Sequence, residues 1–168
     1  LIAGVKAGVQ LKKAPWLQDK LGVQTTTALG QAVYRVQERN RLQGHTNGVF
    51  DVSFSPDSEL IATASADGTL KLWRRDGTLL KTLQEENSWV RCLSFSPNGK
   101  MIASASGLEG TVKIWSLPDS KLIKTLTSNT GYNPVNQVSF SPDSKTIAAA
   151  SYDNSVKLWN VGEGRLLQ

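Results

Sequence analysis

Three segments of this chain repeat one pattern at a spacing of about 40 residues. Each contains V-x-x-[VL]-S-F-S-P, then a run of small residues ending in Ser, then [TS]-[LV]-K-[LI]-W. The shared landmarks are Phe54, Phe95 and Phe140, followed by Trp73, Trp115 and Trp159. A period of this length is typical of stacked copies of one supersecondary unit, since a single unit cannot bury its own hydrophobic faces. We therefore expect three repeats, at about 42–82, 83–125 and 126–168.

One repeat is predicted to form four antiparallel strands. In the first copy, Ser55-Pro56-Asp57-Ser58 predicts a type I turn, because proline presets the backbone angle of its second position. Asp67-Gly68 predicts a two-residue hairpin, where positive φ is needed. The strands expected around these turns are Val49 to Phe54, Leu60 to Ser65, Thr69 to Trp73 and Leu79 to Leu83.

The second strand of each repeat consists almost entirely of small residues. The three versions read I-A-T-A-S, I-A-S-A-S and I-A-A-A-S. A sheet with one wet face would alternate polar and apolar residues, and these runs do not. Both faces are therefore expected to be covered, with neighbouring sheets in close approach.

The segment from Leu42 to Trp73, L-Q-G-H-T-N-G-V-F-D-V-S-F-S-P-D-S … S-A-D-G-T-L-K-L-W, resembles a WD repeat, and the resemblance recurs in register to residue 168. It implies an all-β fold of four-stranded antiparallel blades, which stand radially in a β-propeller. A propeller needs four to eight blades to close its ring. We therefore expect three blades of an incomplete, seven-bladed propeller, with further blades after residue 168.

The resemblance also implies a structural hydrogen-bond network in each blade, made by a His, a Ser or Thr of the second strand, an Asp of the second hairpin, and the Trp. The first copy has all four members, whereas the second and third lack the His. The expected members are His45, Ser65, Asp67 and Trp73 in the first copy, Ser106 and Trp115 in the second, and Ser151, Asp153 and Trp159 in the third.

No catalytic or cofactor site is expected. His45 and Asp67 lie within the implied structural network, which favours a structural over a catalytic role. One His and one Cys, Cys92, cannot supply the usual ligand set of a zinc site. The chain has neither a G-x-x-x-x-G-K-[ST] phosphate loop nor a G-x-S-x-G nucleophile turn. We predict a protein that is not an enzyme and that binds neither cofactor nor metal.

The resemblance also implies that partners bind at the loops before each first strand and at the second hairpins. Trp, Tyr and Arg are the residue types that dominate binding hot spots. The alternative is that these aromatic residues pack over neighbouring loops and close the face. The candidates are Phe50, Trp89, Arg91, Tyr132, Asn136 and Tyr152.

Residues 1–38 differ in composition and are expected to form a helical leader, followed by the propeller segment 39–168. Residues 1–41 carry seven basic and two acidic side chains, whereas residues 42–168 carry twelve of each. The repeats are therefore balanced in charge, and nucleic acid is not an expected partner of the repeats. A nucleic-acid-binding module that uses the basic leader stays open as an alternative. No run of apolar residues is long enough to predict a membrane span.

The junction T-T-T-A-L-G-Q-A-V-Y-R-V-Q-E-R-N-R-L-Q-G-H resembles the one that joins an ATPase domain to a propeller in bacterial, notably cyanobacterial, signal-transduction proteins. It implies that this chain is the regulatory part of a nucleotide-hydrolysing protein whose catalytic domain lies upstream of Leu1. The expected function is a non-catalytic scaffold or sensor that binds proteins or peptides. One Cys suits a reducing compartment, so the expected location is the cytoplasm.

Overall fold

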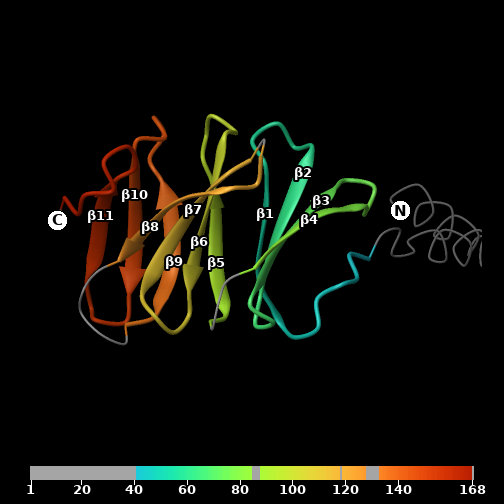
Figure 1. The fold of residues 1–168 in the computed structure, drawn as a ribbon, viewed down its shortest axis with the longest axis horizontal. Helices are drawn as coiled ribbons and strands as arrows, with labels where there is room; N and C mark the ends of the chain where they lie inside the picture. Colours follow the sequence, from blue (N-terminus) through green and yellow to red (C-terminus); the bar gives the residue numbers. More distant parts are fainter. Residues whose placement is uncertain (1–40, 85–87, 118, 128–132, 168) are drawn as a thin grey trace, which may run out of the picture. The chain divides into compact units, whose positions relative to one another are not determined.

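A computed structural model of the chain describes residues 41–84, 88–117, 119–127 and 133–167. These residues form three antiparallel sheets and no helix (Figure 1). The first sheet has the order β1-β2-β3-β4, with strands β1 (Val49–Phe54), β2 (Leu60–Ser65), β3 (Thr69–Arg74) and β4 (Leu79–Gln84). The all-β prediction is confirmed, and the predicted helical leader lies outside the described residues.

The other two sheets repeat this meander. The second has the order β5-β6-β7-β8, with β5 (Val90–Phe95), β6 (Met101–Ser106), β7 (Thr111–Ser116) and β8 (Leu122–Thr127). The third has three strands, β9 (Val135–Phe140), β10 (Thr146–Ser151) and β11 (Val156–Asn160). A single antiparallel bridge, Trp159 with Leu166, lies where the fourth strand runs in the other sheets. The expected division into a leader at residues 1–38 and a propeller segment at residues 39–168 stays a prediction. All the strands lie in the compact unit Leu42–Gln168.

The turn after each first strand is held by a serine hydroxyl. Ser55 Oγ donates to Asp57 Oδ1 at 2.6 Å and accepts the backbone N–H of Leu60 at 2.9 Å. Ser96 and Ser141 make the same pair of contacts in the second and third sheets. The closing residue has positive φ, 62° at Ser58 and 68° at Gly99. This explains why S-P-[DN]-[SG] recurs in all three repeats.

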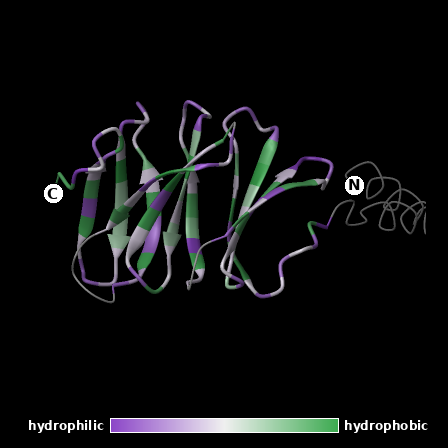
Figure 2. Cartoon of the chain, in the orientation of Figure 1, coloured by the Kyte–Doolittle hydropathy of each residue, from purple (hydrophilic) through white to green (hydrophobic). Residues whose placement is uncertain are grey.

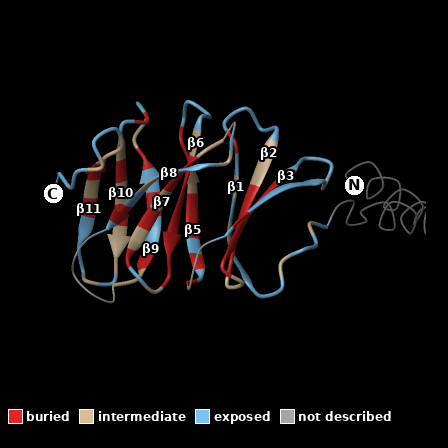
Figure 3. Ribbon diagram, in the orientation of Figure 1, coloured by how far each residue is buried: buried red, intermediate tan, exposed pale blue. Residues whose placement is uncertain are grey.

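The sheets stack face to face through the small residues of their second strands. Ala62, Ala64, Ala103 and Ala105 are completely buried, and Figure 3 shows the central strands as the most buried part of the chain. Hydrophobic residues line these strands, and the hydrophilic ones gather at the turns (Figure 2). The expectation that both faces of the sheets are covered is met at the second sheet, which lies between the other two.

Each first strand packs its apolar side chains on the sheet before it. Leu93 and Phe95 of β5 belong to a core cluster with Ala62, Leu70 and Leu72 of the first sheet. The equivalent residues of β9 pack in the same way on the second sheet. In β1, however, Phe54 is 59% exposed, because none of the described residues covers this face of the first sheet. The stacking is therefore directional, and β1 presents an uncovered copy of the same interface.

Candidate interaction face

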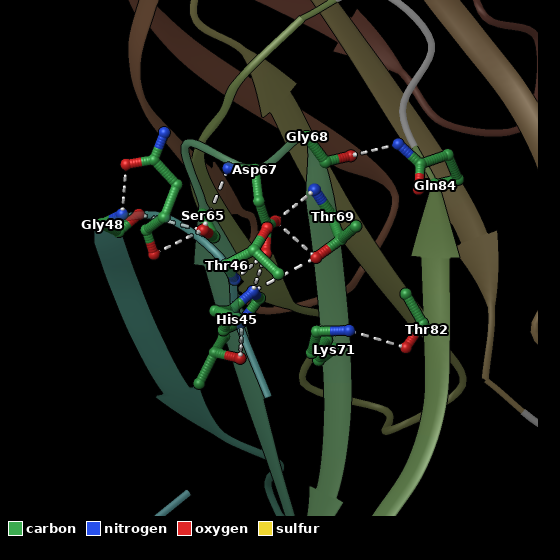
Figure 4. A network of polar contacts seen from close by, with 12 residues as sticks. His45, Thr46, Gly48, Ser65, Asp67, Gly68, Thr69, Lys71, Thr82 and Gln84 are labelled. Carbon is green, nitrogen blue, oxygen red and sulfur yellow. Dashed lines mark hydrogen bonds and ion pairs between the residues drawn. The ribbon is translucent and has the colours of Figure 1, made fainter. Parts of the chain in front are cut away.

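The first blade contains a chain of hydrogen bonds around His45 (Figure 4). His45 Nδ1 lies 2.9 Å from Asp67 Oδ2, and its Nε2 lies 2.7 Å from Thr63 Oγ1. The indole Nε1 of the buried Trp73 donates to the same Thr63 oxygen at 2.9 Å. One buried hydroxyl therefore joins the loop that carries His45 to strands β2 and β3.

Thr63 was missed by the sequence prediction, which placed Ser65 at this position in the network. Ser65 Oγ instead accepts the backbone N–H of Asp67 at 3.1 Å and donates to the carbonyl of Gly48 at 3.0 Å. Ser65 therefore fixes the second hairpin to the loop before β1, two residues away from the contact with Trp73. Thr63 and Ser65 share one face of β2, so composition alone did not separate them.

The second blade repeats this division of roles without a histidine. Trp115 Nε1 donates to Ser104 Oγ at 2.9 Å, so Ser104 takes the place of Thr63. Ser106 Oγ lies 2.5 Å from the hydroxyl of Ser88 and accepts the backbone N–H of Glu109 at 2.9 Å. Ser106 therefore fixes the hairpin, as Ser65 does in the first blade.

In the third blade a lysine takes part in the contact with the hairpin aspartate. Asp153 Oδ2 binds Lys157 Nζ, and Asp153 Oδ1 accepts the hydroxyl of Ser155 at 2.5 Å. Ser151 Oγ accepts the backbone N–H of Asp153 at 3.4 Å. Ala149 stands where the first blade has Thr63, so this position offers no hydroxyl to Trp159. The three networks thus differ in chemistry although they hold the same turn.

The hairpin aspartates are held ionised. Burial raises the pKa of Asp67, but hydrogen bonds from the Thr69 hydroxyl, the Thr46 backbone N–H and His45 outweigh burial and lower it well below its ordinary value. The pKa of Asp153 is also lowered well below its usual range, chiefly by Lys157 and then by Ser155. These carboxylates are therefore committed to structural contacts, and no group of His, Cys, Asp and Glu among the described residues could hold a metal ion.

This pKa shift predicts a specific acid sensitivity. Because the pKa of Asp67 is lower in the folded state, its stabilising contribution is present above the unfolded-state pKa of about 4 and is lost as the pH falls. We expect Asp67→Asn to lose less unfolding free energy than the wild type between about pH 5 and about pH 3. Urea unfolding at each pH measures both losses. An equal loss in the two proteins would contradict the role assigned to Asp67.

Three of the predicted partner-binding residues occupy β-bulges at equivalent positions. The register skips one residue between Val49 and Asp51 and between Val90 and Cys92, which leaves Phe50 and Arg91 unpaired. The same irregularity between β10 and β9 leaves Asn136 unpaired. A bulged residue is turned out of the regular alternation of its strand. The fold therefore presents a different side chain, Phe, Arg or Asn, at the same place on each blade.

The second hairpins lie at the same end of the sheets, fixed to the loops before the first strands. The backbone N–H of Ala66 donates to the carbonyl of Gly48 at 2.8 Å, and Tyr152 donates to Pro134 at 3.0 Å. In the second blade Gly107 donates to Trp89 at 2.9 Å. Loops that are tied to the sheet in this way can display side chains with little loss of entropy on binding.

Five of the six predicted residues gather at this end of the sheets, and we call Phe50, Trp89, Arg91, Asn136 and Tyr152 the aromatic–arginine face. The rings of Phe50 and Trp89 lie 6.2 Å apart, and the Arg91 guanidinium lies 5.3 Å from the centre of the Phe50 ring. Trp89 is 47% exposed and Tyr152 66%. Tyr132, the sixth predicted residue, lies outside the described residues.

Between the second and third blades this face is hollowed into a groove of about 510 Å³. Its walls come from the loops before β5 and β9 and from the two second hairpins. The lining residues are Trp89, Arg91, Gly107, Asn133, Pro134, Asn136 and Tyr152. The sequence analysis did not predict the groove. Its one signal was Gly107, which stands where the other two repeats have Ala66 and Tyr152. Among the described residues, no helix has the length and apolarity that crossing a membrane requires.

Comparison with known proteins identifies the repeats. The family model of the WD domain, G-beta repeat, matches residues 36–74, 77–116 and 120–160. Similar curated proteins include protein hir1 of Schizosaccharomyces pombe, 34% identical over 121 residues, which are 68% of this chain and 13% of that protein. The nuclear distribution protein nudF of Aspergillus terreus is 35% identical over 102 residues, 60% of this chain and 22% of nudF. Nuclear distribution protein PAC1 of Tuber melanosporum is 47% identical over 70 residues, 41% of this chain and 15% of PAC1.

A solved structure agrees with the sequence match. The crystal structure of the RRP9 WD40 repeats superposes with a TM-score of 0.70 and 26% identity, covering 76% of this chain and 39% of that one. In the curated relatives named above, the match to this chain spans less than a quarter of the length of each protein. The matched repeats cover most of the chain, and each contains the first three strands of one antiparallel sheet; the second and third matches begin with the fourth strand of the sheet before. The chain therefore belongs to the WD40 repeat family.

Proposed function

We propose that this chain is a non-catalytic protein-interaction scaffold that binds a protein or peptide partner at the aromatic–arginine face. The observation that carries the proposal is the gathering of Phe50, Trp89, Arg91, Asn136 and Tyr152 at one end of three stacked sheets. Exposed Trp, Tyr and Arg side chains in a well-formed depression are typical of interaction hot spots. WD40 repeat proteins generally act as interaction scaffolds, which agrees with this assignment.

The alternative of nucleic-acid binding has less support. Residues 42–168 carry equal numbers of basic and acidic side chains, whereas phosphate recognition depends on a clear excess of positive charge. The basic excess lies in residues 1–41, of which all but Arg41 lie outside the described residues. Binding of this kind would weaken steeply with salt, so partner capture at low and high salt separates it from the scaffold proposal.

The wider context of the scaffold is a separate hypothesis. The junction sequence before Leu42 supports a sensor in a larger signalling protein, with an ATPase domain upstream of Leu1 and further blades that complete the propeller. The relatives named above are eukaryotic and do not support the bacterial assignment. The gene sequence on both sides of the chain tests the hypothesis, and the absence of an upstream phosphate loop would overturn it. The single cysteine, Cys92, is buried, which suits the cytoplasm that we propose as the location of the chain.

Comparative capture tests the scaffold proposal. Removing one anchor of a hot spot typically costs 2 kcal/mol or more of binding free energy, about a thirtyfold loss of affinity. We expect the wild-type chain to retain specific proteins from a lysate of the source organism. The double variant Trp89→Ala/Tyr152→Ala should retain at least about tenfold less of these proteins. Leu80→Ser is the matched control, because Leu80 is 42% exposed on the outer strand β4. Equal recovery by all three chains would overturn the proposal.

A further inference from the structure

The groove of the aromatic–arginine face is lined by a glycine of the second blade, at a position where the neighbouring blades have side chains. Ala66, Gly107 and Tyr152 occupy equivalent positions, each directly after the second strand. A Cβ at Gly107 would stand 3.6 Å from the Cβ atoms of both Trp89 and Arg91. Because Gly107 lines the groove, a larger side chain there would take up part of its space. The opening is thus specific to this blade and does not follow from the repeat pattern.

The side chains that line this groove offer hydrogen-bond donors and no carboxylate. Arg91 makes no ion pair with any described residue, and no described residue hydrogen-bonds the indole of Trp89, the amide side chain of Asn136 or the hydroxyl of Tyr152. The Arg91 guanidinium lies over the Phe50 ring, a contact that does not use its N–H groups as hydrogen-bond donors to another described side chain. The groove therefore has the electrostatic character of a site for an anionic group.

The carboxylates of Asp51 and Asp153, beside the groove, are already bound by other groups of the protein. Asp51 lines the adjoining hollow together with Arg91, but its two oxygens accept the backbone N–H groups of Val52 and Leu93 at 2.8 and 2.9 Å. Asp153, next to Tyr152, is bound by Ser155 and Lys157. Neither carboxylate is thus a free counter-ion for Arg91, and a ligand can supply one.

We propose that this groove binds an acidic peptide segment, with a Glu or Asp side chain paired to Arg91 and an adjacent apolar residue packed between Trp89 and Tyr152. This inference deepens the proposed scaffold function and rests on it. Arg presents a planar fork that matches a carboxylate in two parallel hydrogen bonds. Recognition of phosphate groups usually uses clusters of arginines, whereas this groove has one. A carboxylate-bearing peptide is thus the better match.

Selection from phage-displayed random peptides on the full 168-residue chain tests the proposal. We expect the wild type and the control Arg75→Gln, an exposed arginine outside the groove, to enrich peptides with an acidic residue beside an apolar one. Arg91→Gln should lose the acidic preference, and Gly107→Leu should lose enrichment although every donor is retained. Circular dichroism and thermal unfolding of each variant verify that it is folded.

A synthetic peptide from the wild-type pool supplies the quantitative test. Replacing its acidic residue by the corresponding amide should weaken binding to the wild type at least about tenfold and binding to Arg91→Gln by less than about twofold. Enrichment of neutral or basic peptides, or an equal loss in both proteins, would overturn the acidic-peptide inference and leave the scaffold proposal standing. If the wild type enriched peptides no more than Trp89→Ala does, both the acidic-peptide inference and the scaffold proposal would be overturned.

Discussion

Replacing Phe95 by Ala is expected to lower the free energy of unfolding by about 3–5 kcal/mol, whereas Phe54→Ala should cost less than about 1 kcal/mol. The two residues hold the same position in successive repeats, but Phe95 is 8% exposed and Phe54 59%. Phe95 packs with Ala62 and Leu70 of the preceding sheet, so its truncation leaves a cavity between two blades. The same truncation at Phe54 removes a side chain that is already exposed to solvent.

Urea unfolding followed by circular dichroism measures both losses under identical conditions. Phe140→Ala, at 8% exposure, should behave like Phe95→Ala. Equal costs at positions 54 and 95 in this chain would contradict the directional stacking. In a longer chain whose further blade covers β1, the cost at Phe54 should rise toward that at Phe95. The same comparison therefore also tests the proposed completion of the propeller.

Thr63→Val is expected to lower the free energy of unfolding by about 1–3 kcal/mol, although the two side chains have nearly the same shape. The change removes the oxygen that accepts from Trp73 Nε1 and that contacts His45 Nε2. Trp73 is 1% exposed, so its indole N–H would be left without a partner in the interior. Leaving a buried donor unsatisfied costs its full desolvation penalty.

Thr125→Val is the matched control, because it makes the same chemical change at an exposed position of β8. Its effect should lie within about 0.5 kcal/mol of zero. Urea unfolding of the two variants gives the comparison. If Thr63→Val proved as stable as Thr125→Val, the buried hydroxyl would not hold the first blade together.

The repeat period allowed the fold to be predicted well because one pattern, read three times, sets strand, turn and stacking together. The S-F-S-P turns, the small second strands and the buried tryptophans all occur where the sequence indicated. The wrong detail was the hydroxyl that holds each tryptophan. Thr63 and Ser104 pair with the third strand, whereas Ser65 and Ser106 lie beyond the last pair, and this register depends on the hairpin between the strands.

The candidate site was predicted in part. Its residues were found from their position and type, but the reason for their display was not. The bulges at Phe50, Arg91 and Asn136 arise from pairing between strands, which no local motif reports. The groove depends on a glycine at one blade and a tyrosine at the next, a difference that acts only when the two blades are side by side.

The claim that the aromatic–arginine face binds a partner is tested most directly by hydrogen exchange on the intact chain, with and without the partner that the wild type retains. Backbone amides slow their exchange when an interface covers them. We predict new protection in the loops before the first strands, at residues 47–50, 88–91 and 133–136, and in the second hairpins at 107–110 and 152–155. The opposite turns, at 75–78 and 161–165, should exchange at an unchanged rate. Protection confined to those opposite turns would contradict the account.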